Sequence, residues 1–300
     1  MQFKFTNANF PKTADGRVYH VGVKHGEVAN RIITVGDPSR ARTIAKLLDD
    51  NSPIVTIESD RGFFIKTGRY HGVPISIVSI GMGLAMMDFF VREVRAVVDG
   101  PLIIIRFGSC GSIGPATIGS MMVPHGAFAV LRNYDYFADD AEPNSKPYNF
   151  TKLFYADPDL CSKLQKELLR HLPQSELHTG LNASCDSFYS SQGRLDNNFC
   201  DANHNLIEQI LVKYPDARSL EMETFMLFHM AKVSTPLPIK ESQANKKSIR
   251  VAAMMMVFMD RKTNEFVDPV RVSYLEEIAG KALLNVLSNV ELDYEENGSD

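Results

Sequence analysis

The sequence has few cysteines, and their spacing excludes the classes of protein that depend on them. The four cysteines, Cys110, Cys161, Cys185 and Cys200, form no Cys-x-x-Cys pair and have no histidine-rich spacing near them. Structural zinc sites need such patterns, and free thiols are favoured over disulfides as well. The sequence therefore predicts free thiols in a reducing compartment.

Long hydrophobic runs and an excess of positive charge are also absent. The first residues, MQFKFTNANFPK, lack the apolar core of a signal peptide, and no window approaches the roughly 20 apolar residues of a membrane-spanning helix. The formal net charge of −4 gives no overall attraction to nucleic acid or to an anionic membrane. We therefore expect a soluble, cytoplasmic protein with neither kind of partner, in which local arginines capture any anionic substrate.

What is present is the composition of a globular protein. Of the 300 residues, 44% are hydrophobic and 23% are charged, which is enough apolar material for a large core. No linker or internal repeat divides the chain. We expect an irregular N-terminal segment over residues 1–18, one domain over residues 19–290, and an acidic tail over residues 291–300.

Short apolar runs followed by glycine or charge recur along the chain. Gly36 follows RIITV, Gly81 follows ISIVSI, Arg106 follows LIII, and Asp260 follows a methionine-rich run. Helical spacing of apolar residues between these runs predicts an α/β fold. Because ligands of open α/β sheets bind outside the carboxyl ends of the strands, we expect a site at that edge.

The stretch from Leu102 to Gly114, LIIIRFGSCGSIG, is the most informative one. Residues 102–105 predict a short buried strand that ends at Arg106, before a loop of glycines and small residues that includes Ser109 and Cys110. Glycines allow backbone N–H groups to approach an anion, and an arginine adds a fork of donors suited to phosphate. We predict that this stretch is the floor of a phosphate or oxyanion site.

Four other segments have expected boundaries that bear on the site. Asp37 and Pro38 suit the N-cap and first position of a helix, which places Gly36 beside a helix N-terminus, a natural place for an anion. The segment from Leu220 to Thr224 is expected to open a helix. Residues 133–150 and 234–248 are expected to be polar surface loops, and whether either closes over the site stays open.

Five motifs together resemble one family of enzymes. They are GDPSR (Gly36–Arg40), SIGMG (Ser79–Gly83), IIRFGSCGSIG (Ile104–Gly114), DSFYSSQGR (Asp186–Arg194) and LEMET (Leu220–Thr224). In this order they resemble the nucleoside phosphorylases, and among them the eukaryotic-type uridine phosphorylases. The resemblance implies a single α/β domain whose central mixed, twisted, partly barrel-like sheet is flanked by helices. The implied reaction is the reversible phosphorolysis of uridine to uracil and ribose 1-phosphate.

The resemblance assigns the phosphate to five residues. They are Gly36, Arg40, Arg61, Arg106 and Ser109, with Arg61 reaching in from a neighbouring subunit. The residues themselves favour four of these assignments, because they offer a glycine turn at a helix N-terminus, arginines and a hydroxyl in a glycine-rich loop. Without the resemblance, Arg61 would be read as a solvated turn arginine.

The uracil and ribose sites are likewise implied by the resemblance. Gln192 offers a donor and an acceptor to the lactam edge of uracil, Arg194 takes the other carbonyl oxygen and the charge on the leaving base, and Phe188 stacks on the ring. The ribose-binding residues are His20, Cys110, Met222 and Glu223, with His20 reaching the 5′-hydroxyl across a dimer.

The implied catalysis depends on positioning and electrostatics. Arg194, Gln192, Arg106 and Glu223 are the expected catalytic residues, and no metal ion, organic cofactor or covalent intermediate is needed, since inorganic phosphate is a co-substrate. The sites shared through His20 and Arg61 imply a homo-oligomer, which we expect to be a dimer.

Several residues depart from the family pattern. Cys110 stands where relatives usually carry serine or threonine, and Asp260 precedes Arg261 where pyrimidine enzymes usually have asparagine. We expect Asp260 to form a salt bridge with Arg194 or Arg261, although an acid here also resembles the group that protonates purines in related enzymes. Phe258 and Met259 are bulkier than the family's aliphatic residues.

Alternative functions therefore stay open at this point. A purine nucleoside phosphorylase is disfavoured by Gln192 and Arg194, and a nucleosidase that uses water is disfavoured by the phosphate arginines. A catalytically weak nucleoside-binding paralogue is a third alternative, kept open by Cys110 and Asp260. The sequence does not choose between uridine and thymidine or deoxyuridine.

Overall fold

The computed structural model describes residues 5–234 and 248–292, in which eleven strands form one sheet. The polar loop predicted over residues 234–248 and the acidic tail lie almost entirely outside these ranges. Along the sheet the order is β10-β9-β6-β11-β5-β1-β4-β3-β2, with β7 and β8 paired to β6. The strands are β1 (Arg31–Val35), β2 (Val55–Glu58), β3 (Phe64–Tyr70), β4 (Val73–Ser79), β5 (Leu102–Ser112), β6 (Met121–Arg132), β7 (Tyr148–Phe150), β8 (Phe154–Tyr155), β9 (Leu177–Cys185), β10 (Ala217–Glu221) and β11 (Ile249–Asp260).

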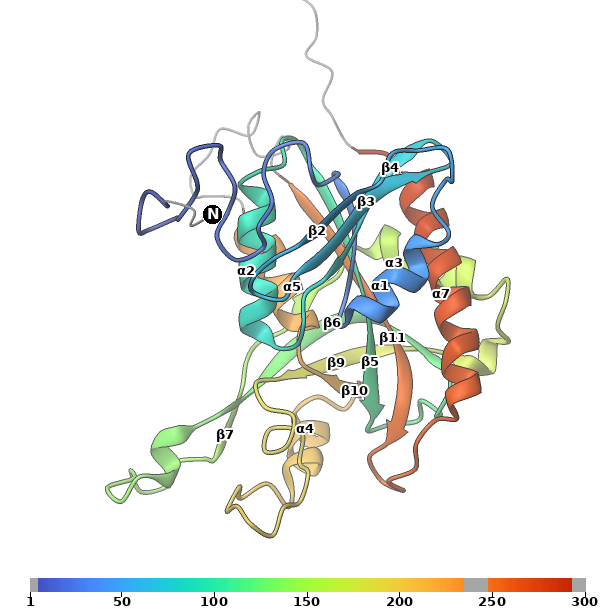
Figure 1. Cartoon of the computed structure of the whole chain (residues 1–300). Coiled ribbons are helices and arrows are strands. Elements are labelled where there is room, and N and C mark those ends of the chain that lie inside the picture. Colours follow the sequence, from blue (N-terminus) through green and yellow to red (C-terminus); the bar gives the residue numbers. More distant parts are fainter. Residues whose placement is uncertain (1–4, 235–247, 293–300) are drawn as a thin grey trace, which may run out of the picture.

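Half of this sheet closes on itself. The strands β5, β11, β6, β9 and β10 follow one another as neighbours, and β10 returns to pair with the end of β5 through Ser219–Ser112 and Leu220–Gly111. The other half, from β1 to β2, extends outward as an open sheet (Figure 1). The predicted mixed, partly barrel-like α/β fold is confirmed.

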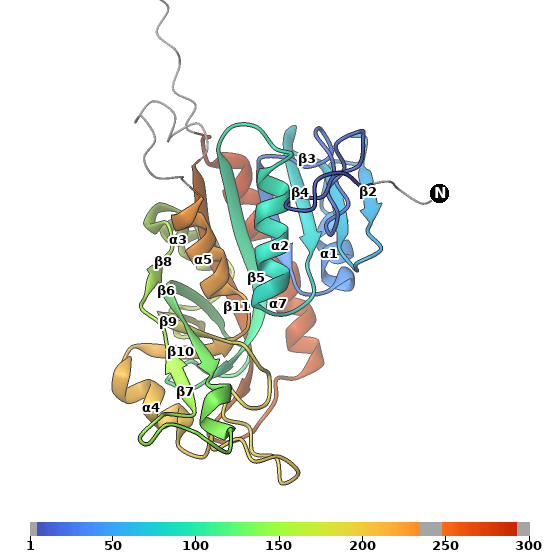
Figure 2. The same cartoon turned by 90° about the vertical axis from the view of Figure 1, so that its left-hand side faces the viewer.

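Helices cover both faces of the sheet, because successive strand residues point to opposite sides. The helices are α1 (Pro38–Ala45), α2 (Leu84–Arg95), α3 (Pro158–Leu168), α4 (Leu206–Lys213), α5 (Thr224–Val233) and α7 (Pro269–Asn289), with short 3₁₀ turns at Tyr134–Phe137 and Gln174–Glu176. Ile33 and Ile103 pack with α1, α3 and α7, whereas Ile32 and Ile104 pack with α2 and α5. Figure 2 shows α2 and α5 lying over one face of the central strands. Of the helices in the described ranges, none combines the length and apolarity needed to cross a bilayer.

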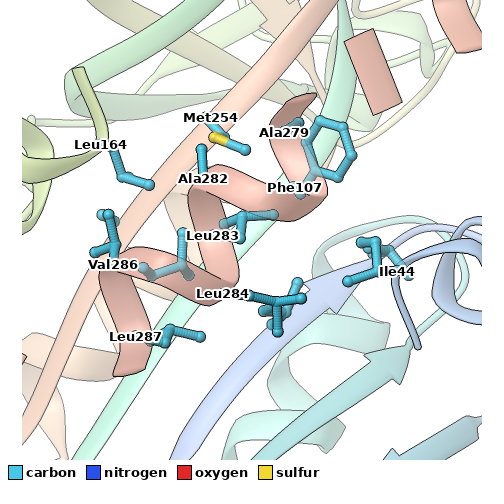
Figure 3. Packing of buried hydrophobic residues seen from close by; sticks show 14 of the residues in the cluster. Ile44, Phe107, Leu164, Met254, Ala279, Ala282, Leu283, Leu284, Val286 and Leu287 are labelled. Atoms are coloured by element: carbon cyan, nitrogen blue, oxygen red, sulfur yellow. The ribbon is translucent and has the colours of Figure 1, made fainter. Parts of the chain in front are cut away.

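The long helix α7 supplies much of the first of these two cores. Its buried residues recur at helical spacing, and Leu283 and Val286 are 0% and 3% exposed. Figure 3 shows side chains of α7 gathered with Met254 of β11, Leu164 of α3 and Ile44 of α1. This packing fixes α1 and the ends of β5 and β11 relative to one another, and these elements border the site described below.

Three sequence-based boundaries were wrong. The strand expected to end at Ile105 continues to Ser112, and Leu220 and Glu221 belong to β10 rather than to the following helix. The segment 133–150 is not all loop, because it contains a 3₁₀ turn and β7. Small residues hide the extension of β5, since glycine, serine and cysteine give no alternation of large apolar side chains, while their pairing partners lie in β11 and β10.

Candidate active site

A cavity of about 400 Å³ opens where β1, β5 and β11 end and β10 turns into α5. It is lined by Gly36, Asp37, Arg40, Gly81, Met82, Arg106, Gly108, Ser109, Cys110, Gly111, Phe188, Gln192, Arg194, Leu220, Glu221, Met222, Glu223, Phe258 and Met259. All the predicted site residues except His20 and Arg61 are among them. A set of residues spread over nearly 190 positions of sequence therefore converges on one hollow at the expected edge of the sheet.

A gap in the sheet forms part of the cavity wall. Pairing of β1 with β5 stops at Phe107, and pairing of β10 with β5 starts at Gly111. Among the described strands, residues 108–110 therefore pair with β11 alone. Because backbone groups along an open strand edge lack sheet partners, this edge can offer N–H donors to a bound anion. The predicted anion floor is thus the open edge of a strand, not a loop.

The N-terminus of α1 forms a second wall. Asp37 is the N-cap, and its carboxylate accepts a hydrogen bond from the backbone N–H of Arg40 at 2.9 Å. The Arg40 side chain is 9% exposed; its Nε donates to Glu276 of α7 at 2.9 Å, and its guanidinium lies over the Phe107 ring. Arg40 is therefore held in place before any ligand binds.

Arg106 is the most constrained cation of the site. It is 5% exposed, its Nη2 donates to Glu223, and Glu221 lies 3.3 Å from the same nitrogen. Burial favours the neutral form, but the two carboxylates outweigh it and raise the pKa of Arg106. Its Nη1 is buried without a hydrogen-bond partner among the residues that the structure describes. That nitrogen is a donor left over for a ligand in the cavity.

Gly108 makes room for this guanidinium. A Cβ built at Gly108 would lie 1.7 Å from Nη1 of Arg106 and 2.7 Å from its Cζ. Real Cβ atoms do not approach so closely, so any larger residue would displace the arginine. The glycine is needed here for the close approach of a side chain rather than for a positive φ.

Two glutamates with different environments follow β10. The carboxylate of Glu221 accepts hydrogen bonds from Asn182, Ser184 and the backbone N–H groups of Glu223 and Thr224. Burial would raise its pKa, but Arg106 and these donors lower it. Glu223 accepts from the backbone N–H of Gly83 at 2.6 Å and from Arg106, and burial raises its pKa against the effect of Arg106. Both glutamates line the cavity, and Glu223 accepts hydrogen bonds from fewer donors than Glu221 does.

The segment after β9 forms the opposite end of the cavity. Gln192 is 3% exposed, and its side-chain amide forms no hydrogen bond with any described residue. The Arg194 guanidinium lies 3.9 Å from the centre of the Phe188 ring, and its Nε donates to the Phe188 carbonyl at 3.0 Å. Burial and the nearby charge of Arg261 lower the pKa of Arg194 to about 10, so it stays positive at neutral pH. This end of the cavity presents a free amide beside a cation.

Cys110 lines the cavity with a buried thiol. It is 4% exposed, its thiol donates to the Met256 carbonyl at 3.6 Å, and burial raises the pKa of the thiol. At neutral pH it is therefore a protonated, apolar part of the wall.

His20 and Arg61 do not reach the cavity of their own chain. Arg61 donates through Nη2 to the Tyr19 hydroxyl at 2.6 Å, and the Tyr19 ring packs edge-on against His20. The two residues thus form a separate cluster with Tyr19, outside the cavity lining.

The ion pair expected for Asp260 was wrong, and the contacts of the neighbouring Arg261 were not predicted. The Asp260 carboxylate accepts from the backbone N–H groups of Lys262 and Thr263 and forms no ion pair within the described part of the chain. It caps a turn, as aspartates commonly do. Arg261 instead donates to the carbonyls of Gln192 and Gly193 at 3.4 and 3.2 Å, behind the base end of the cavity. Its position after a strand end was the only sequence signal for this contact.

Comparison with known proteins gives consistent matches. The family model described as the phosphorylase superfamily matches residues 30–234. A uridine phosphorylase of Thermococcus kodakarensis is 31% identical over 266 residues, which cover 88% of this chain and 84% of the relative. A DeoD-type purine nucleoside phosphorylase of Oceanobacillus iheyensis is 26% identical over 213 residues, covering 71% of this chain and 80% of the relative.

Solved structures match over nearly the whole chain. A structure from a study of two diverse uridine phosphorylases of the oomycete Phytophthora capsici is 37% identical, has a TM-score of 0.87, and covers 96% of this chain and 100% of its own. A nucleoside phosphorylase of Trypanosoma brucei has a TM-score of 0.74 at 20% identity, covering 94% of this chain and 100% of its own, and supports the fold alone.

Proposed function

We propose that this chain, which belongs to the phosphorylase superfamily, is a pentosyltransferase that catalyses the reversible phosphorolysis of uridine to uracil and ribose 1-phosphate. The observation that carries the proposal is the pairing of two unlike ends in one cavity. One end holds a buried arginine with an unused donor, Arg106, and the other holds a free amide beside a cation, Gln192 and Arg194. Phosphate needs the first end, and the base of a nucleoside needs the second.

At the first end, phosphate is held by Arg106, Arg40, Ser109 and the open edge of β5, next to the N-terminus of α1. Helix N-termini and arginine donors both favour a phosphate dianion. Arg61 completes this set from a neighbouring subunit. The dianion lies below C1′ of the sugar, where it offsets the positive charge that develops as the glycosidic bond breaks.

At the other end, the Gln192 amide pairs with the lactam edge of uracil. Arg194 stabilises the negative charge on the departing base, and the low polarity of the half-buried site strengthens this effect. The Arg194 guanidinium packs against the Phe188 ring, so Phe188 positions this cation as well as bordering the base. This recognition holds equally for uridine, deoxyuridine and thymidine, which share the edge.

The ribose lies between the two ends, against Glu223, Met222 and Cys110. Glu223 accepts the 2′- and 3′-hydroxyl hydrogen bonds, which tighten as the ring flattens. No metal ion or organic cofactor takes part in the proposed reaction, because phosphate is itself the nucleophile. Prolonged dialysis against EDTA should therefore leave the rate unchanged.

We further propose that the active form is a cytoplasmic homodimer with shared sites. The support is the position of His20 and Arg61, which form a cluster outside the cavity of their own chain. Chains that carry Arg194→Ala, mixed with chains that carry Arg61→Ala after unfolding and refolding, should regain part of the activity, because one of the two cavities of a mixed dimer then has both arginines. No recovery in the mixture would contradict shared sites.

Purine phosphorolysis is the weaker alternative. The matches to purine nucleoside phosphorylases support it, but the acid that it would use, Asp260, has its carboxylate committed to a turn and does not line the cavity. A panel assay separates the candidates. Uridine, thymidine and inosine are each followed by absorbance with and without phosphate, and we expect phosphate-dependent loss of uridine and no turnover of inosine.

A further inference from the structure

A buried carboxylate on α2 holds the segment that contains His20. Glu93 is 6% exposed, and within the described part of the chain it forms no ion pair with an arginine or lysine. It accepts hydrogen bonds from the backbone N–H of Val21 at 2.7 Å, from that of His20 at 3.0 Å, and from Nδ1 of His20 at 2.7 Å. Buried carboxylates persist where such donors replace water.

The same helix also fixes the plane of the imidazole. Phe89 lies one turn before Glu93 on α2, and its ring stacks on that of His20 with centroids 4.0 Å apart and 13° between planes. Positions four apart project from the same helix face. The ring of His20 is therefore held at one nitrogen by Glu93 and on one face by Phe89, and its remaining freedom of rotation is small.

This arrangement determines which nitrogen can accept a hydrogen bond. An ionised carboxylate can only accept hydrogen bonds. Nδ1 of His20 therefore carries a proton and donates it in the hydrogen bond to Glu93. In the neutral imidazole, Nε2 then has a free lone pair. It forms no hydrogen bond to any part of the chain that the structure describes, and the side chain is 26% exposed. A ligand hydroxyl can donate to it.

We propose that Glu93 is a positioning residue, which holds His20 in the Nδ1–H tautomer so that Nε2 accepts a hydrogen bond from the 5′-hydroxyl of a nucleoside. The inference rests on the proposed function, and the nucleoside is the one bound in the neighbouring subunit. His25 and Asp99 provide a contrast in the same region. They pair at 3.0 Å but are 76% and 93% exposed at their side chains, so water competes with the contact.

The test compares two substrates that differ only in the 5′-hydroxyl. In the variant Glu93→Gln, the amide can donate to Nδ1, which favours the other tautomer and removes the acceptor at Nε2. We expect kcat/KM for uridine to fall about fivefold to tenfold, the loss of one hydrogen bond, while kcat/KM for 5′-deoxyuridine changes less than about twofold. Asp99→Asn is the matched control and should leave both values unchanged. Equal losses for both substrates would overturn the proposal, because they would show a structural role only.

A second measurement does not depend on turnover. The protein is labelled with ¹⁵N-histidine, and the signals of His20 are identified by their loss in His20→Ala. Their nitrogen chemical shifts should show a protonated Nδ1 and an unprotonated Nε2. In Glu93→Gln the proton should instead be on Nε2. An Nε2–H tautomer in the wild type would overturn the inference even if uridine were not the substrate. If Glu93→Gln does not fold, Phe89→Leu replaces it, and the same selective loss with uridine is expected. A wild type that turns over neither substrate but shows protonated Nδ1 would refute the proposed function and leave the tautomer assignment standing.

Discussion

Arg106 and Glu223 form a buried ion pair, with Nη2 of the arginine donating to the carboxylate and both side chains less than a tenth exposed. The pair joins the residue proposed to hold phosphate to the residue proposed to hold ribose. Because each fixes the position of the other, a change at the sugar side alters the phosphate side. Binding of the two substrates is therefore expected to be coupled.

Replacing Glu223 tests this coupling. In Glu223→Gln the arginine keeps Glu221 at 3.3 Å but loses its closest partner. We expect kcat/KM for uridine to fall by about 10- to 150-fold, the value of a hydrogen bond to a charged group, and the KM for phosphate to rise as well. Steady-state kinetics with each substrate varied would measure both. Glu277→Gln, which breaks an exposed pair with Lys281, is the control. An unchanged phosphate KM would argue against coupling.

Gly108 allows a second test through shape alone. In Gly108→Ala the new methyl group overlaps the Arg106 guanidinium, so the arginine must move. Overpacking of this kind costs about 1–3 kcal/mol. We expect lower thermal stability and a loss of at least about 30-fold in kcat/KM for phosphate, roughly 2 kcal/mol in the barrier.

Gly280→Ala serves as the control for that variant. This glycine lies within α7, and its nearest neighbour is a leucine methyl group at 3.3 Å, which can give way. Alanine is also the better helix former. Activity should be unaffected, and wild-type phosphate kinetics in Gly108→Ala would show that the position of Arg106 does not matter.

Arg194 tests the base end. In Arg194→Ala the leaving base loses its nearest cation, and we expect uridine turnover to fall by about 100- to 1,000-fold, as when a donor to a developing negative charge is removed. Circular dichroism should show an intact fold. Arg170→Ala, at an exposed arginine paired with Glu167, should behave like the wild type. Activity within about tenfold of wild type, roughly 1.4 kcal/mol, would refute the uracil assignment.

The thiols should differ sharply in reactivity. Burial raises the pKa of Cys110, Cys185 and Cys161, the last to about 12, and only Cys200 is exposed among the four. The thiolate is the reactive form, so raised pKa values protect the buried three. Iodoacetamide at pH 7.5 should modify Cys200 alone in the native protein, as peptide mass spectrometry would show. Rapid modification of Cys110 would contradict its place in the wall.

The edge of the sheet that carries the site could be predicted from local patterns, whereas the residues at the base and sugar ends of the cavity followed only from the resemblance to nucleoside phosphorylases. Gly36 and Arg106 each follow a short apolar run, and parallel strands bring such ends together. Pairing between distant strands could not be predicted. The extension of β5 to Ser112 depends on β11 and β10, and small residues carry no periodicity that would reveal it.

Side-chain partners were the least predictable part. Asp260 was expected to form an ion pair. The turn that follows instead offers it two backbone N–H donors, those of Lys262 and Thr263, only two and three residues further along the sequence. Glu93 was not singled out at all, since a glutamate in a helix is usually solvated. Its burial follows from the docking of residues 19–21 on α2, a contact over more than 70 positions of sequence.

The most direct test of the account is the mass balance of one reaction. The protein is incubated with uridine and inorganic phosphate, and phosphorus and carbohydrate products are followed by ³¹P and ¹H NMR. We predict uracil and ribose 1-phosphate in equal amounts, and no uracil when phosphate is left out. Uracil accompanied by free ribose, or turnover of inosine but not of uridine, would contradict the proposed phosphorolysis.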